Sequence, residues 1–199
     1  MSENNINSRL VVTTRNVNYY EYYLGDLTDR TDHLDLVKAL RASNEGDTCR
    51  IYINSNGGLT SSAVQIRTAI LESMAHVITR AEGDCCSAGT MVLLSGHEIE
   101  IVPNTVFMVH EASFGYYGKQ FENKSFVDYY HNLNKTMLED IYKGFLTEEE
   151  MERVLRGEDL WIRESSYEER LTNFFNERNK DGEEGQLEAQ TEPVLNLQD

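Results

Sequence analysis

Four short segments of this sequence carry residue types that together can cleave an acyl bond. The glycine pair Gly57-Gly58 follows one apolar segment, and Ser87 opens a second. His110 ends a third apolar segment, and Asp159 precedes a fourth. A nucleophile, a base, a carboxylate that orients the base and a backbone site for an oxyanion are the parts of a serine hydrolase. Each part is weak alone, but the four in this order favour serine-based acyl transfer.

Ser87 lies in the small-residue segment Gly83–Thr90, between an expected strand and an expected helix. Free backbone N–H groups and the helix dipole at such a position can stabilise a developing oxyanion. Ala88 and Gly89 would let a substrate carbonyl approach the backbone. The alternative is that Ser87 is only a helix N-cap. The G-x-S-x-G motif of α/β-hydrolases is absent, because position 85 is Cys.

His110 follows the continuously apolar segment Val106–Val109, which predicts a buried strand. The carboxyl ends of parallel strands are where such sheets place ligands. A structural histidine is the alternative. Asp159 can orient His110, and Glu158 is the rival carboxylate. The other histidines are expected on polar faces (His33, His131) or at the ends of elements (His76, His97).

The glycine pair Gly57-Gly58 follows an expected strand and permits positive φ and a close backbone approach. A plain turn is the alternative. A phosphate-binding loop is not expected, because neither the G-x-x-x-x-G-K-[ST] nor the G-x-G-x-x-G pattern occurs.

Composition limits the class of protein. The 199 residues are enough for one domain with a sizeable core, and 40% hydrophobic with 26% charged residues fits a globular protein. A net charge of −16 disfavours nucleic acid and anionic membranes as partners. No apolar run approaches the roughly 18 residues of a membrane span. The start of the chain lacks the features of a signal peptide, so a cytoplasmic location is expected.

Cys49, Cys85 and Cys86 have neither a disulfide pattern nor the paired spacing of a zinc site. We therefore expect small buried thiols, no bound metal and no cofactor.

Strands and helices alternate up to His110, which predicts parallel pairing and an α/β fold. The expected strands are Tyr19–Leu24, Arg50–Ile53, His76–Ala81, Glu98–Val102 and Val106–Val109, and the expected helices are Asp32–Leu40, Thr60–Met74 and Ala88–Leu94. The second half begins with an extended segment, Glu111–Lys119, and continues with a long helix, Phe121–Phe145. A capping box at Thr147 and Glu150 opens a helix that ends at Gly157, and a last helix follows Ser165. We divide the chain into an amino-terminal arm (1–20), one domain (21–178) and an acidic, disordered tail (179–199).

Taken together, these segments resemble the proteolytic subunit of the Clp protease, the ClpP family. The resemblance spans roughly Tyr22 to Phe174, and it is specific because the order and spacing of the segments match. The segments that carry it are Ile51–Gly58, Asp84–Thr90, Val102–His110 and Glu158–Ile162.

The resemblance implies a crotonase-like α/β fold of ββα repeats with a protruding handle helix at Phe121–Phe145. It implies that Ser87 is the nucleophile, His110 the general base and Asp159 the orienting carboxylate. The backbone N–H groups of Gly58 and Ala88 would form the oxyanion hole. The segment after His110 would pair with extended peptide, so that the groove residues are Gly57, Glu111, Ala112, Ser113, Phe114 and Gly115.

The implied function is a self-compartmentalising serine endopeptidase that acts on unfolded or extended polypeptides. Its partners would be copies of itself in stacked rings, a pair of heptamers by resemblance, and a separate AAA+ unfoldase. Two alternatives stay open: a catalytically silent ring subunit, and a crotonase-type acyl-transfer enzyme.

The sequence departs from the usual pattern of the family at several positions. Asn56 stands where proline is usual, Cys85 and Cys86 where alanines are common, and Ala88 where methionine is common. These departures and the short amino-terminal arm suggest a divergent, specialised or viral member, located in the cytoplasm or, for a virus, in the host cytoplasm.

Overall fold

The computed structural model of the protein describes residues 16–115 and 117–191, with side chains as far as residue 180. Residues 1–15, which make up most of the expected amino-terminal arm, lie outside the described residues, as do residues 192–199 of the expected tail.

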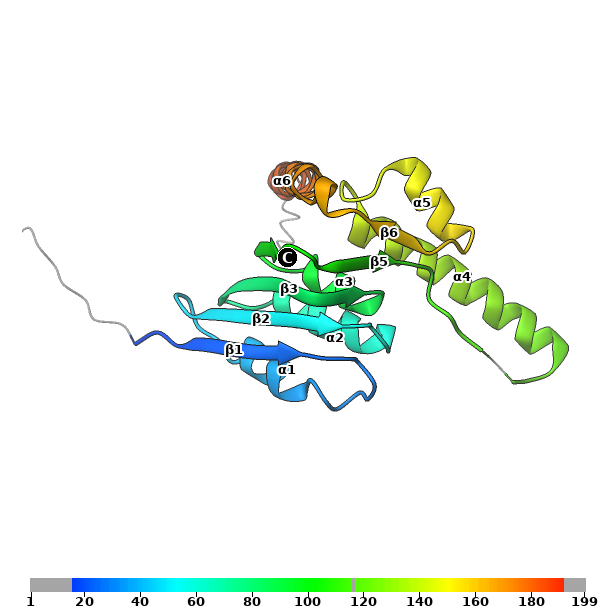
Figure 1. Ribbon diagram of the computed structural model, residues 1–199, viewed down its shortest axis with the longest axis horizontal. Coiled ribbons are helices and arrows are strands. Elements are labelled where there is room, and N and C mark those ends of the chain that lie inside the picture. Colours follow the sequence, from blue (N-terminus) through cyan, green and yellow to red (C-terminus); the bar gives the residue numbers. More distant parts are fainter. Residues whose placement is uncertain (1–15, 116, 192–199) are drawn as a thin grey trace, which may run out of the picture.

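One six-stranded sheet forms the centre of the described part of the chain (Figure 1). Its strands lie in the order β1-β2-β3-β5-β6, and β4 pairs with an upstream stretch of β3. All pairs are parallel, as expected, except the pair between β5 and β6, which is antiparallel. The strands are β1 (Tyr19–Leu24), β2 (Thr48–Ser55), β3 (His76–Cys86), β4 (Glu98–Ile101), β5 (Val106–Val109) and β6 (Leu160–Ile162).

Helices α1, α2 and α3 lie on one side of the sheet (Figure 1). Ile51 and Ile53 of β2, together with Ile66 and Ile70 of α2, belong to the buried core. The helices of the described residues are α1 (Leu34–Arg41), α2 (Thr60–Leu71), α3 (Ala88–Leu93), α4 (Gln120–Tyr142), α5 (Glu148–Leu155) and α6 (Tyr167–Thr191), with a 3-10 turn at Glu164–Ser166.

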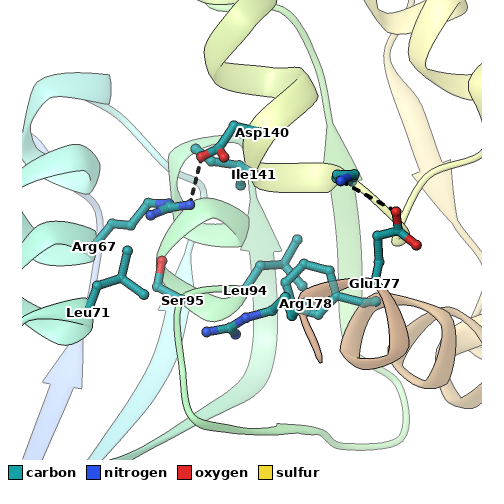
Figure 2. Close-up of a pocket in the computed structure, with 10 residues that line it drawn as sticks. Arg67, Leu71, Leu94, Ser95, Asp140, Ile141, Glu177 and Arg178 are labelled. Atoms are coloured by element: carbon teal, nitrogen blue, oxygen red, sulfur yellow. Dashed lines mark hydrogen bonds and ion pairs between the residues drawn. The ribbon is translucent and has the colours of Figure 1, made fainter. Parts of the chain in front are cut away.

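The buried residues of the long helix α4 all lie in its carboxyl-terminal half. Its buried residues are Asn134, Leu138, Ile141 and Tyr142, and an ion pair of 2.8 Å between Arg67 of α2 and Asp140 ties it to the helical layer (Figure 2). Its amino-terminal half projects beyond the sheet (Figure 1). The structure therefore contains the protruding helix expected from the sequence.

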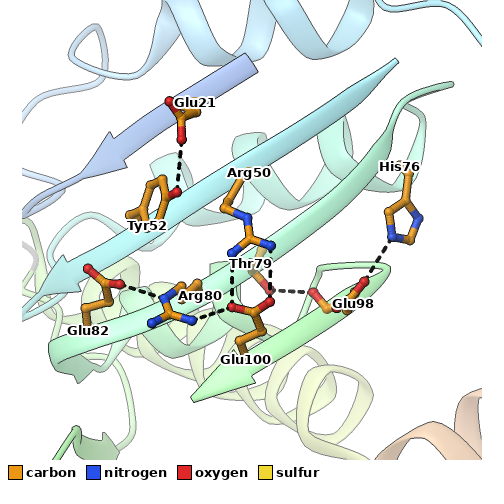
Figure 3. Close-up of polar contacts among 9 residues, drawn as sticks. All are labelled: Glu21, Arg50, Tyr52, His76, Thr79, Arg80, Glu82, Glu98 and Glu100. Carbon is orange, nitrogen blue, oxygen red and sulfur yellow. Dashed lines mark hydrogen bonds and ion pairs between the residues drawn. The ribbon is translucent and has the colours of Figure 1, made fainter. Parts of the chain in front are cut away.

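The opposite face of the sheet carries charged side chains (Figure 3). Arg50 of β2 donates two hydrogen bonds of 3.2 Å to Glu100 of β4, and Arg80 of β3 contacts both Glu100 at 2.7 Å and Glu82 at 2.6 Å. Because successive strand residues point to opposite faces, residues between these charged positions, such as Ile51 and Ala81, enter the core.

Two expectations from the sequence differ from the structure. Helix α6 continues through Thr191, whereas a disordered tail was expected from residue 179. Strong helix formers such as Glu, Gln, Leu and Ala in this stretch are compatible with helix despite its acidity. His33, expected on a polar face, is 1% exposed, and its Nε2 lies 2.9 Å from Oε1 of Gln65. Tertiary packing of α1 against α2 buries this histidine.

An ion pair between α5 and α6 should make stability depend on acid pH. Arg170 donates to both carboxylate oxygens of Glu150 at 2.8 and 2.6 Å, and this lowers the pKa of Glu150 to about 2. A lowered pKa stabilises the fold above the unfolded-state value of about 4.3, and the contribution disappears as the pH falls towards 2. We expect Glu150→Gln to lose about 1–2 kcal/mol of unfolding free energy at pH 7, after allowance for solvent screening.

Urea unfolding at pH 7 and at pH 2.5 measures this effect. Glu152→Gln is the matched control, because Glu152 forms an exposed i,i+4 pair with Arg156 and should change stability little. An equal loss for Glu150→Gln at both pH values would contradict the prediction.

Candidate active site

The sheet brings the expected catalytic residues to one edge. Ser87 directly follows β3, and His110 directly follows β5, which is the neighbour of β3 there. Asp159 precedes β6, and Val109 pairs with Leu160. Because β6 runs antiparallel to β5, the start of β6 meets the end of β5, and this register places Asp159 beside His110.

The side chains form a chain of contacts. The Oγ of Ser87 lies 2.7 Å from Nε2 of His110, a distance at which the hydroxyl donates to the ring nitrogen. Nδ1 of His110 lies 3.4 Å from Oδ1 of Asp159. The rival carboxylate, Glu158, accepts instead a hydrogen bond of 2.8 Å from Nε of Arg153. The geometry thus selects Asp159 over Glu158.

The backbone of Ser87 has a conformation rare for a residue with a side chain, with φ 51° and ψ −124°. Such strain costs of order 1–3 kcal/mol and is found mainly at functional sites. Although Ser87 stands at the start of α3, its side chain makes no capping hydrogen bond. The N-cap alternative therefore does not describe Ser87, and its hydroxyl is directed to His110.

Buried hydroxyl groups hold the carbonyl of Ser87. Oγ1 of Thr90 donates to that carbonyl oxygen at 2.6 Å and lies 2.6 Å from the hydroxyl of Tyr142. Since the Thr90 proton is already used, Tyr142 is the donor in the second bond. Burial raises the pKa of Tyr142, which keeps this donor protonated. No residue pattern in the sequence indicated this link between α4 and the site.

The two expected oxyanion donors have suitable orientations. Ala88 is the first residue of α3, so its N–H has no acceptor within the helix. Leu27 donates to the carbonyl of Gly57 at 2.7 Å and accepts from the N–H of Leu59 at 2.8 Å. Gly58 lies between Gly57 and Leu59, and in a parallel bridge the N–H of this middle residue points away from the bridged residue, here Leu27. The N–H of Gly58 is therefore directed towards β3, after which Ser87 lies.

Gly57 is required by a close approach rather than by a plain turn. A Cβ atom at this position would lie 2.7 Å from Cβ of Ser87 and 2.8 Å from the carbonyl oxygen of Cys86, and φ is +101°. Only glycine fits both the space and the backbone conformation.

Gly57→Ala should therefore displace the serine and destabilise the fold. We expect a loss of about 2–4 kcal/mol from strain and overpacking, together with a strong loss of any Ser87-dependent activity. Thermal unfolding measures the stability. Gly25→Ala is the control, since a Cβ added there would meet nothing within 4 Å and the φ of Gly25 is not positive. Similar stability for the two variants would refute the argument.

A pocket of about 460 Å³ lies beside the candidate site. One of its walls is formed by residues at the start of α2, which come just after the glycine pair in the sequence, and another by residues that come just after His110. The expected groove residues Ala112, Ser113 and Phe114 line this pocket. Glu111 instead faces His131 of α4, with 3.6 Å between Oε1 and Nδ1. Residues 111–115 form no strand in the described part of the chain, so the expected peptide-pairing strand is not preformed here.

The α4 side of this pocket was not anticipated. Most of the α4 side chains that line the pocket are apolar. The exception is Asn134, whose amide is buried and whose Nδ2 has no hydrogen-bond partner among the described residues. The helical spacing of Tyr130, Leu133 and Met137 was the available signal, although spacing alone cannot say what a helix faces. The lining residues missed are Thr60, Ser61, Val64, Tyr130, Leu133, Asn134 and Met137.

The three cysteines are free and buried, as expected. Burial raises the pKa of Cys49 to about 11, so its thiol is protonated. Within the described residues, no group of three His, Cys, Asp or Glu side chains has the geometry to hold a metal ion. No helix in those ranges has the length and apolar character needed to cross a membrane.

The fold and its strand ends define an α/β protein in which Ser, His and Asp are arranged as in enzymes of nucleophilic acyl transfer. The family model described as Clp protease matches residues 10–159, more than half of the chain, and the chain belongs to this family. The structure of a ClpP1 point mutant from Listeria monocytogenes is similar, with a TM-score of 0.60 and 18% identity. The match covers 78% of this chain and 87% of that chain. The predicted family and the ClpP-like fold are thereby confirmed.

Proposed function

We propose that this protein is a serine endopeptidase that hydrolyses peptide bonds in unfolded or extended polypeptides. The observation that carries the proposal is the contact of 2.7 Å between Ser87 Oγ and His110 Nε2, at a serine held in a strained backbone conformation. Asp159 lies on the far side of the imidazole. Membership of the Clp protease family supports peptide hydrolysis as the chemistry.

In the proposed mechanism, Ser87 Oγ attacks the carbonyl carbon of the scissile peptide while His110 Nε2 takes the hydroxyl proton. Asp159 keeps the other ring proton on Nδ1 and stabilises the imidazolium. The new oxyanion accepts hydrogen bonds from the N–H groups of Gly58 and Ala88. His110 then gives its proton to the leaving amine, and water, activated by the same histidine, releases the acyl group from Ser87.

The proposed substrates are extended chains. Residues 111–115 make no backbone–backbone hydrogen bond with other described residues, so a peptide could pair with this segment. Such pairing uses the backbone groups of the substrate peptide, so it accepts substrates of many different sequences. The pocket lined by Val64, Phe114 and Met137 would receive a substrate side chain next to the scissile bond.

The direct test is labelling with a fluorophosphonate, followed by peptide mapping and an assay with short fluorogenic peptides. The proposal expects a covalent adduct on Ser87 and peptide hydrolysis that the adduct abolishes. A catalytically silent subunit would neither label nor cleave. A crotonase-type enzyme would turn over an acyl-CoA without labelling at Ser87, and either result would refute the proposal.

Assembly into stacked rings is proposed from the surface of α4. Phe121 is 81% exposed and Tyr129 63% exposed, and Val127 and Leu133 are also exposed. Exposed apolar surface of this kind usually marks an interface. We expect light scattering to give a multiple of the 22.9 kDa chain mass, with two stacked heptamers as the expected form. A mass of one chain under conditions where peptidase activity persists would contradict the assembly.

Because the sequence lacks a P-loop motif, nucleotide-driven unfolding would need a separate AAA+ partner. Without that partner, the assembled protein should cleave unfolded proteins and spare stably folded ones. Both the partner and a cytoplasmic site of action, or the host cytoplasm for a viral protein, are part of this proposal.

A further inference from the structure

A second cavity, of about 100 Å³, lies among the helices (Figure 2). Its lining does not include Ser87, His110 or Asp159. It is enclosed by α2, the end of α3, α4 and α6. Its lining includes three cationic side chains, Arg67, Lys143 and Arg178, and two carboxylates, Asp140 and Glu177. This gives a surplus of one positive charge in a protein whose net charge is −16.

Arg178 of α6 is the unusual member of this group. Its guanidinium is half-buried, donates a hydrogen bond of 3.0 Å to the carbonyl of Gly96 and lies 5.5 Å from the ring centre of Phe174. No carboxylate of the described residues lies within ion-pair distance of it. Burial lowers the pKa of Arg178, and the charge of Arg67 lowers this pKa further. Its positive charge therefore lacks the compensation that a desolvated cation needs.

The two carboxylates of the cavity are held by other cations. Asp140 pairs with Arg67 at 2.8 Å. Glu177 lies 3.4 Å from Lys143 and 3.1 Å from Lys180. In Figure 2 the guanidinium of Arg178 points away from the carboxylate of Glu177. Neither carboxylate is thus placed to neutralise Arg178.

We propose that this cavity binds a small tetrahedral oxyanion, either free phosphate or the phosphate group of a small monoester, between Arg67 and Arg178. The planar donor fork of arginine matches phosphate oxygens in bidentate geometry. The bound anion would compensate the positive charge of Arg178 and would reduce the electrostatic repulsion between Arg178 and Arg67. The volume has room for several water molecules, and so for one tetrahedral oxyanion. The site draws on no residue of the proposed peptidase mechanism.

Isothermal titration of the full-length protein with inorganic phosphate, at constant ionic strength set by sodium chloride, tests the site. We expect saturable binding of one phosphate per chain, weakened at least tenfold in Arg178→Gln and in Arg67→Gln. Arg156→Gln is the control, because Arg156 forms an exposed pair with Glu152 on α5 and should leave binding unchanged. A parallel titration with glycerol 3-phosphate shows whether monoesters also enter.

Circular dichroism verifies that the variants fold. Since Arg178 also bonds to Gly96, Arg67→Gln provides an independent test if Arg178→Gln does not fold. Binding of phosphate alone identifies the free ion as the ligand, and equal binding of the monoester identifies the phosphoryl group. Absence of saturable binding to the wild-type protein, or unchanged affinity in a folded arginine variant, would overturn the proposal.

Discussion

Replacement of Ser87 by alanine is expected to lower kcat/KM for a short fluorogenic peptide by about 10⁴-fold or more and to abolish fluorophosphonate labelling. The reason is that Ser87 Oγ is the only proposed atom that can form the acyl intermediate. Its neighbour His110 cannot replace it, because Nε2 is placed to receive the serine proton at 2.7 Å.

The same variant should fold normally. Alanine keeps the Cβ of serine, so the cost of φ 51° is unchanged, and the serine hydroxyl makes no capping bond that would be lost. We expect a change in unfolding free energy within about 1 kcal/mol. Ser165→Ala, at an exposed serine, is the matched control for activity. Retained peptide hydrolysis by folded Ser87→Ala would show that another group is the nucleophile.

Asp159→Asn is expected to give the second large effect, a fall in kcat of about 10²- to 10⁴-fold. An amide in place of the carboxylate no longer holds the proton on Nδ1 of His110 and no longer stabilises the imidazolium. The Asp159 side chain is 57% exposed and 3.4 Å from His110, so water can replace part of its role. The loss should therefore be smaller than that for Ser87→Ala.

Glu158→Gln is the matched control for this prediction, because Glu158 is adjacent in sequence but bonds to Arg153. We expect its activity to stay within about twofold of wild type, since surface ion pairs contribute little. Steady-state kinetics with one peptide substrate compares the wild-type protein, Asp159→Asn and Glu158→Gln. A greater loss for Glu158→Gln than for Asp159→Asn would reverse the assignment of the orienting carboxylate.

Much of the architecture follows from local pattern. Alternating strands and helices predicted the parallel sheet from β1 to β5, and helical spacing predicted α4. Ser87 was identified in a small-residue segment between an expected strand and an expected helix, and His110 was identified directly after an apolar strand. Parallel strands of one sheet present their carboxyl ends at one edge. These properties depend on neighbours in the sequence, so the sequence is sufficient to reveal them.

Other features depend on contacts between distant segments. Residue types alone left Glu158 as a rival to Asp159, which the family resemblance favoured. The antiparallel register of β6, which places Leu160 beside Val109, shows that Asp159 is the carboxylate beside His110. The need for glycine at position 57 appears only when Ser87, which comes much later in the chain, lies against it.

The sequence by itself thus determined the candidate chemistry and the elements that carry it, because residue type and periodicity are local. Only the tertiary structure shows that Asp159 lies beside His110, which helix lines the pocket after His110 and which cations share the second cavity. Arg178 and its acceptor on Gly96 are 82 residues apart. Such contacts form when the chain buries its apolar faces together, and no local pattern records which side chains then meet.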